Sequence, residues 1–302
     1  GTLDFTGALQ LAGKARMSSD HIDFDSLSIK GPGQIEASGR FGLGHAASDL
    51  KLSWRELRWP LRGEAADVLI GGLDGGGSFS GRLDDYRYQL DTAALWRKLP
   101  LRLKSQGQGS LSQIGFAPLN VAVEKGTAEV SGTLAWSPAL KADLKGTVSN
   151  LDPALFNADW APPCAAKTTS KSARKPAACP PSVINATFDT HTTMQNGQPQ
   201  IAFDASVERS QLRGYPLSLA AQGSTDTRSV RLQKFLLQSG QGSLSASGTA
   251  AWAPQLRADL EAQLQNFDPA QFAAAFKGNI NGNLTAHTRD SGGKPDIAFG
   301  LA

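Results

Sequence analysis

The chain contains one stretch of sequence twice. Residues 131–156 read SGTLAWSPALKADLKGTVSNLDPALF, and residues 247–272 read SGTAAWAPQLRADLEAQLQNFDPAQF. The two stretches align without a gap at an offset of 116 residues, with 15 identities in 26 positions. Self-similarity at a fixed period is the signature of a repeat architecture, in which each copy forms one structural unit. We therefore expect a fold that is built from repeats.

A second pair of matching stretches sets the length of the repeat. Residues 197–203 (GQPQIAF) match residues 293–299 (GKPDIAF) at an offset of 96. The two offsets differ by 20 residues, which is the length of the segment 161–180, so this segment is interpreted as an insertion. A weaker copy of the unit begins upstream, around Ala37-Ser38-Gly39. The predicted units of about 96 residues are 1–97, 98–213 with the flexible insertion 161–180, and 214–302, which is truncated.

Apolar residues recur at every second position within each unit. Leu99, Leu101 and Leu103 alternate with Pro100, Arg102 and Lys104, and the same period runs through 128–136 and 140–148 and through their copies. Period two, interrupted by Gly, Asn and Asp, predicts antiparallel strands. The sequence predicts an all-β chain, with three stacked units that favour an elongated, solenoid-like body.

Three short stretches depart from this pattern. Asp152-Pro153 and Asp268-Pro269 each place an N-cap residue before a proline, which predicts short helices, the second over 270–276. The glycine-rich stretch 71–77 is predicted to be a turn. Period two does not say whether the apolar faces close into a two-sheet sandwich or line an open trough, so both arrangements stay open.

The positive charge of the chain is concentrated in the insertion. The whole chain carries a net charge of +3, but the segment 161–180 contains four Lys or Arg residues and no acid, which leaves −1 for the rest. The same segment holds both cysteines, Cys164 and Cys179. In an oxidising compartment they would form a disulfide, stabilising the folded state by ~3 kcal/mol in the loop-entropy model. Free thiols and a metal site are the alternatives.

Catalytic chemistry is not indicated by any motif. His21 lies among aspartates, but alternation directs Ile22 and Phe24 inward and leaves His21 with the acids on a solvent face. His45, His191 and His287 are expected in turns or at strand ends, without a paired acid and base. Residues 71–77 lack the Lys-Ser/Thr of a phosphate-binding loop. We expect no enzyme, no cofactor and no metal.

The charge distribution also argues against a nucleic-acid partner. Binding DNA or RNA needs a basic surface, and outside the insertion the chain is slightly acidic. No apolar run approaches the ~20 residues of a transmembrane helix. No targeting segment is recognisable, and both ends fall in mid-strand, so we expect a piece of a longer protein.

Two sequence patterns resemble a known family. Residues 52–61 (LSWRELRWPL) and the repeated SGTxxWxP…NxDPAxF unit resemble the TamB family of Gram-negative bacteria, within the AsmA-like group of bridge-like lipid transport proteins. The resemblance covers essentially the whole chain and implies the middle of a long periplasmic rod of β-taco architecture with an open hydrophobic groove. It also implies an inner-membrane anchor, a helix that is N-terminal to these residues.

The resemblance implies two alternative functions. The first is passage of phospholipid acyl chains along the groove between the inner and outer membranes. The second is a structural scaffold or chaperone for outer-membrane protein clients, working with a TamA-type outer-membrane barrel protein that is contacted through other regions. Each CH₂ of an acyl chain removed from water contributes ~0.8 kcal/mol, so a long apolar trough suits the first role without any catalytic group.

The predicted groove-lining residues are the recurring inward aliphatic and aromatic side chains of the repeats. They are Leu101, Leu103, Val130, Leu134, Leu140, Leu144, Ile201, Phe203, Leu217, Leu219, Leu256, Leu260 and Leu264. As core residues of a closed sandwich they would show the same spacing, so the sequence leaves that alternative open.

Overall fold

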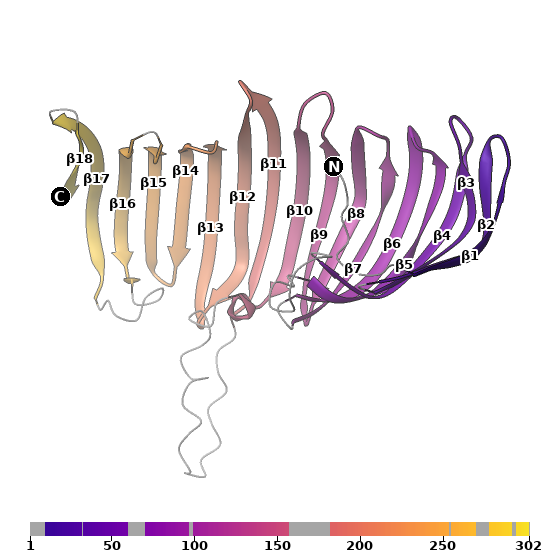
Figure 1. The fold of residues 1–302 in the computed structure, drawn as a ribbon. Helices are drawn as coiled ribbons and strands as arrows, with labels where there is room; N and C mark the ends of the chain where they lie inside the picture. The colour runs from indigo at the N-terminus through magenta and orange to yellow at the C-terminus, as the bar shows by residue number, and fades with distance from the viewer. Residues whose placement is uncertain are drawn as a thin grey trace, which may run out of the picture. The chain divides into compact units, whose positions relative to one another are not determined.

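The fold consists of two compact units, Gly1–Pro138 and Ala139–Ala302. The computed structural model describes residues 10–31, 33–59, 70–96, 99–156, 182–253, 255–269, 278–291 and 294–301. Within these residues each unit is a curved antiparallel sheet in which each strand pairs with the next strand in sequence (Figure 1). Among the described residues of the first unit, β1 pairs with β2, and no pairing between β1 and β9 closes the sheet.

The strands of the two units follow one another in chain order. The first unit contains β1 (Gln10–Met17), β2 (His21–Lys30), β3 (Gln34–Gly42), β4 (Ser48–Trp59), β5 (Ile70–Arg82), β6 (Asp85–Trp96), β7 (Leu99–Gly109), β8 (Gln113–Val123) and β9 (Gly126–Ala135). The second contains β10 (Lys141–Leu151), β11 (Ile184–Gln195), β12 (Gln198–Leu212), β13 (Tyr215–Thr225), β14 (Ser229–Ser239), β15 (Gly242–Ala251), β16 (Arg257–Phe267), β17 (Ile280–Ser291) and β18 (Lys294–Leu301). This is the predicted all-β, repetitive class.

The strand bounds reproduce the sequence repeat. Strands β7, β8, β9 and β10 recur 116 residues later as β13, β14, β15 and β16, with the same first and last positions. Strand β11 recurs 96 residues later as β17. The division into compact units at Pro138 is a separate property of the chain, so the predicted repeat boundaries at 97/98 and 213/214 stay a prediction.

Each sheet has one apolar face and one polar face. Residues that pair across an antiparallel ladder lie on the same face, and Leu101 pairs with Ala94 and Val123. In β6, Thr92 and Ala94 on this side are 5% exposed, whereas Leu95 on the other side is 46% exposed. We call the side that carries Leu101, and in the second unit the side that carries Leu144, the apolar face.

Neither unit contains the filled core of a closed sandwich. No second sheet covers the apolar face of either unit in the described residues, and no side chain among them is less than 2% exposed. The few buried apolar residues are small or medium: Ala94, Val123, Ala142, Leu237 and Ala286. The apolar side chains are therefore half-buried against one another within one curved sheet, and no described residue covers the apolar face from outside.

The glycine-rich stretch 71–77 is a strand and not the predicted turn. It lies within β5, where Gly75 and Gly77 are on the apolar face between β4 and β6. The Trp54 ring crosses this strand, and its Nε1–H donates to Thr92 Oγ1 of β6 at 3.0 Å. A Cβ atom on Gly77 would lie 2.5 Å from the Gln89 carbonyl oxygen and 3.6 Å from the Trp54 ring. The absence of a side chain at Gly77 thus allows the backbone of β6 and the Trp54 ring to lie close to β5.

The short helix after Asp152 is a single 3₁₀ turn, Pro153–Leu155. Asp152 caps it through a side chain that accepts from the Ala154 N–H at 2.9 Å, as the Asp-Pro pattern predicts. The second predicted helix, 270–276, and both cysteines, for which a disulfide is predicted, lie outside the described residues.

Candidate functional site: the apolar face

Aromatic and aliphatic side chains line the apolar face of the first unit. Phe79 and Tyr86 lie with ring centroids 4.9 Å apart, and Tyr86 and Tyr88 lie 6.5 Å apart. Burial raises the pKa of the Tyr86 phenol. The face continues strand by strand through Ile22, Phe24, Ile35, Phe41, Leu50, Leu52, Leu90, Leu101, Leu103, Phe116, Val121, Val130 and Leu134.

Polar atoms on this face are paired. The Tyr88 hydroxyl donates to the Gly115 carbonyl at 3.1 Å and lies 3.1 Å from Ser105 Oγ. Thr92 Oγ1 accepts from Trp54 and donates to the Asp74 carbonyl at 3.2 Å. Because these groups already have partners, they can lie at an apolar surface without an uncompensated desolvation cost.

The second unit has an equivalent apolar face that carries fewer aromatic side chains than the face of the first unit. Ladder partners place Phe188, Phe203, Leu219, Phe235, Leu237 and Leu244 on one side, together with alanines and glycines. The Thr190 hydroxyl on this side is likewise satisfied, because its Oγ1 donates to the Leu144 carbonyl at 3.1 Å. The second unit thus resembles the first: medium-sized side chains form its apolar face, and no described residue covers that face.

The structure places most of the predicted lining residues on these two apolar faces. Those on the face of the first unit are Leu101, Leu103, Val130 and Leu134. Those on the face of the second unit are Leu144, Ile201, Phe203, Leu217, Leu219, Leu260 and Leu264. Leu140 and Leu256 instead precede β10 and β16, where they are 40% and 54% exposed.

Some contributors to the face were not predicted from the sequence. Trp54, Phe79, Tyr86 and Tyr88 share it with the aliphatic residues. Their alternation within β4, β5 and β6 was a usable signal, but the weaker sequence repeat in the first unit gives no aligned copy to strengthen it.

The polar face carries ion pairs between neighbouring strands. Arg102 and Lys104 of β7 hold Asp91 of β6 at 2.9 and 3.2 Å. The hydrogen bond from Arg102 is the main cause that lowers the pKa of Asp91 from its usual 3.8 to about 2. All three side chains are exposed, so these ion pairs contribute little to stability.

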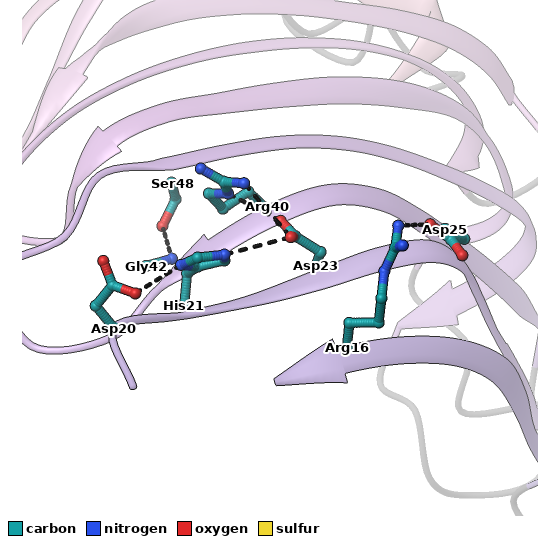
Figure 2. Close-up of polar contacts among 8 residues, drawn as sticks. All are labelled: Arg16, Asp20, His21, Asp23, Asp25, Arg40, Gly42 and Ser48. Carbon is teal, nitrogen blue, oxygen red and sulfur yellow. Dashed lines mark hydrogen bonds and ion pairs between the residues drawn. The ribbon is translucent and has the colours of Figure 1, made fainter. Parts of the chain in front are cut away.

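A second polar cluster surrounds His21 (Figure 2). Its Nδ1 lies 2.7 Å from Asp20 and its Nε2 lies 3.3 Å from Asp23, while Arg40 donates to Asp23 at 2.8 Å. The Arg40 hydrogen bond lowers the pKa of Asp23, and the His21 hydrogen bond lowers that of Asp20. As predicted, His21 and Asp23 lie on the face opposite Ile22. The two carboxylates contact different ring nitrogens, so they do not form a joint chelate.

The prediction for His191 and His287 is wrong. Both lie within strands, β11 and β17, and each pairs with an aspartate of the preceding strand. His191 Nδ1 contacts Asp143, and His287 Nδ1 lies 2.8 Å from Asp259. Sequence separations of 48 and 28 residues concealed these pairs, which the ladder registers of β10–β11 and β16–β17 bring together. Each pair is exposed on the polar face, at equivalent positions of the repeat.

Hollows in the described surface also occur on the polar side. One, of about 600 Å³, lies over β14 to β17 between Lys234, Glu261 and Asn283, above Ser245 and Ser247. Its walls are the flanking long side chains and its floor is made of small ones. Among the described residues no three His, Cys, Asp or Glu side chains are grouped to hold a metal ion. No helix in the described part of the chain is long and apolar enough to span a bilayer.

These features define a class: a repetitive open β-sheet with one continuous apolar face per unit. A family model described as TamB, N-terminal domain, matches residues 11–174 and 194–297. The chain therefore belongs to the TamB family, as its sequence resemblance indicated. The expected position in the middle of the full-length protein stays a prediction. Comparisons with curated proteins and with solved structures found no match.

Proposed function

We propose that this chain is a segment of a periplasmic lipid conduit, in which phospholipid acyl chains lie on the apolar face. TamB-family membership implies a periplasmic bacterial protein and supports this location. In the proposal, transfer runs between the inner and outer membranes, and the full-length protein is anchored in the inner membrane by a helix outside these residues.

One observation carries the proposal: the apolar face of each unit is half-buried, and no described residue covers it. Soluble proteins rarely leave a contiguous apolar surface of this kind without a ligand or partner. Each CH₂ that moves from water onto such a face contributes about 0.8 kcal/mol, and the headgroup can stay in water at the open side. The step needs no acid, base, metal or cofactor.

Photo-crosslinking tests the proposal with neighbouring residues of one strand. Leu260 pairs with Gly248 and Ala286 on the apolar face, while the next residue, Glu261, pairs with Ser247 on the polar face. A photoreactive amino acid at position 260 of the complete protein in cells should capture phospholipid, and one at 261 should not. Leu144 and Lys145 in β10 form a second matched pair. Capture at the polar positions without capture at 144 and 260 would contradict the proposal.

A scaffold for outer-membrane protein assembly is the second candidate, supported by the same family membership. It would engage outer-membrane protein clients, and a TamA-type barrel protein through regions beyond these residues. The same photo-crosslinks separate the two roles, because a scaffold predicts protein adducts at Leu144 and Leu260 in place of lipid adducts.

A further inference from the structure

Two tryptophans occupy equivalent loop positions, each directly after a strand of its own unit. Trp136 follows β9 in the first unit, and Trp252 follows β15 in the second. The Trp136 indole N–H donates to the Leu111 carbonyl at 2.9 Å, and that of Trp252 donates to the Thr227 carbonyl at 3.1 Å. Their backbone N–H groups donate to Ser112 and Arg228 carbonyls, both at 2.9 Å. Each tryptophan is thus fixed to the neighbouring loop by two hydrogen bonds, one from its indole and one from its backbone.

Both indoles remain exposed in spite of this fixation. Trp136 is 47% and Trp252 is 52% exposed. A tryptophan that served only to join two loops would be expected to bury its ring, because the ring carries most of its burial free energy. Trp252 comes two residues after Ala250 of the apolar face, and Leu256 comes two residues before Ala258 of that face. We call Thr227, Arg228, Trp252 and Leu256 the rim of the second unit.

Positive charge lies at the rim as well. Arg228 is exposed and forms no ion pair with the described residues. The nearby acid, Asp226, is turned into its own loop: its Oδ1 accepts from the backbone N–H groups of Arg228 at 2.7 Å and Ser229 at 2.6 Å. Those hydrogen bonds, the one from Arg228 first, lower the pKa of Asp226. The Arg228 guanidinium is therefore available to an external anion.

We propose that the rim of the second unit binds a phospholipid at the boundary between its acyl chains and its phosphate. This inference rests on the proposed conduit function. The Trp252 ring and Leu256 contact the part of the acyl chain nearest the headgroup. An amphipathic indole is favoured at such a boundary between apolar and aqueous surroundings. Arg228 faces the phosphodiester, because a planar guanidinium makes charge-assisted, bidentate hydrogen bonds to phosphate oxygens.

The first unit provides an internal comparison. It retains the fixed indole of Trp136, but Ser112 occupies the position equivalent to Arg228. Leu111, which is 69% exposed, occupies the position equivalent to Thr227. The first unit therefore offers Trp136 and Leu111 as apolar contacts without that arginine, and it should hold a phospholipid more weakly at the phosphate.

Site-specific photo-crosslinking to phospholipid tests the inference. The complete protein carries the photoreactive residue at Leu256, with the exposed neighbour Gln255 as the control and Leu260 as the reporter of the conduit itself. The probes are vesicles of phosphatidylethanolamine and phosphatidylglycerol. We expect lipid adducts at 256 and 260 and several-fold fewer at 255. Adducts at 260 without adducts at 256 would overturn the rim alone; absence at both would overturn the conduit and the rim together.

Two variants separate a binding role of the rim from a structural one. Arg228→Gln keeps the backbone hydrogen bonds of the loop and removes only an exposed guanidinium. It should lower the adduct yield at 256 several-fold, leave the yield at 260 unchanged, and be rescued in part by Arg228→Lys. Trp252→Ala should lower the yield at 256 as well. An unchanged yield at 256 in Arg228→Gln would overturn the assignment of the phosphate contact.

Discussion

Ion pairs on the polar face join neighbouring strands through single side chains. Asp91 is the clearest case, because Arg102 and Lys104 of the next strand both contact its carboxylate. Its folded-state pKa of about 2 lies below the usual value of 3.8. The contribution of this group to folding is therefore fully present above pH 4 and is lost as the pH falls towards 2.

Replacing the main partner of Asp91 should shift that titration. In Arg102→Gln we expect the pKa of Asp91 to rise from about 2 towards 3.8, because the guanidinium hydrogen bond is the largest cause of its depression. Carboxyl ¹³C NMR measures the titration directly. Arg87→Gln is the control, since Arg87 is exposed on the same face of β6 and makes no ion pair with the described residues. An unmoved Asp91 pKa would contradict the role of Arg102.

Single glycines make room for the aromatic residues of the apolar face. A Cβ on Gly77 would lie 2.5 Å from the Gln89 carbonyl oxygen, while one on Gly115 would have its nearest neighbour, the Gln108 carbonyl oxygen, at 3.4 Å. Gly77→Ala should destabilise the protein by about 1–3 kcal/mol through overpacking. Gly115→Ala should stay within about 0.5 kcal/mol of the parent. Urea unfolding compares the two, and equal midpoints would refute the close approach.

Strands of the second unit contain bulges. At each of two bulges, an asparagine side chain of the next strand accepts a hydrogen bond from the backbone of the bulged residue. Asn150 and Asn266 have φ values of 54° and 47°, and the ladder register shifts at each of them. Asn185 Oδ1 accepts from the Asn150 N–H at 2.9 Å, and Asn281 Oδ1 accepts from the Asn266 N–H at 2.6 Å. Asn185 also donates to the Arg209 carbonyl at 2.8 Å, at a bulge of the strand beyond. Since a bulge bends its strand, their recurrence contributes to sheet curvature.

Removing one of these side-chain acceptors should loosen one bulge. Asn281→Ala leaves the Asn266 N–H without its acceptor, at a cost of about 0.5–1.5 kcal/mol. We expect faster hydrogen exchange of the Asn266 amide, with little change in amides at the far end of β16. Asn283→Ala, two residues along the same exposed face, is the control. Equal exchange at Asn266 in both variants would show that the acceptor is dispensable.

The whole molecule combines a repetitive body with one insertion that carries its net positive charge. Strands β10 and β16 are equivalent, as are β11 and β17, yet the connection between the first pair is 20 residues longer. The cross-strand pairs Asp143–His191 and Asp259–His287 keep the same ladder register in both cases. The sheet therefore forms the same pairing with and without the inserted residues.

Deleting residues 161–180 should consequently leave the sheet intact. Loop-closure entropy changes by only about 0.6 kcal/mol for each doubling of loop length, so the shorter connection brings little energetic change apart from the loss of any Cys164–Cys179 bond. We expect an unchanged far-UV circular dichroism spectrum and weaker retention on a cation exchanger, because the net charge falls from +3 to −1. A reduced β-sheet signal would show that the insertion supports the fold.

The repeat and the alternation were readable because they are local. Strand positions, the two offsets and the inward side of Leu101 or Leu260 follow from neighbours in the chain. Contacts between distant positions were not readable. The glycines at 71–77 have the composition of a turn, and only the structure shows that they form a strand crossed by the Trp54 ring. The His287–Asp259 pair depends on the register between β16 and β17.

The sequence by itself determined that this chain is an all-β repeat of the TamB family, with one apolar side to its strands. Only the tertiary structure decided that this side remains open. The physical reason is that period-two alternation specifies which residues leave water, and not what covers them. Each sheet lies alone in its unit, without a second sheet or a fully buried side chain among the described residues, so its apolar face stays uncovered by them.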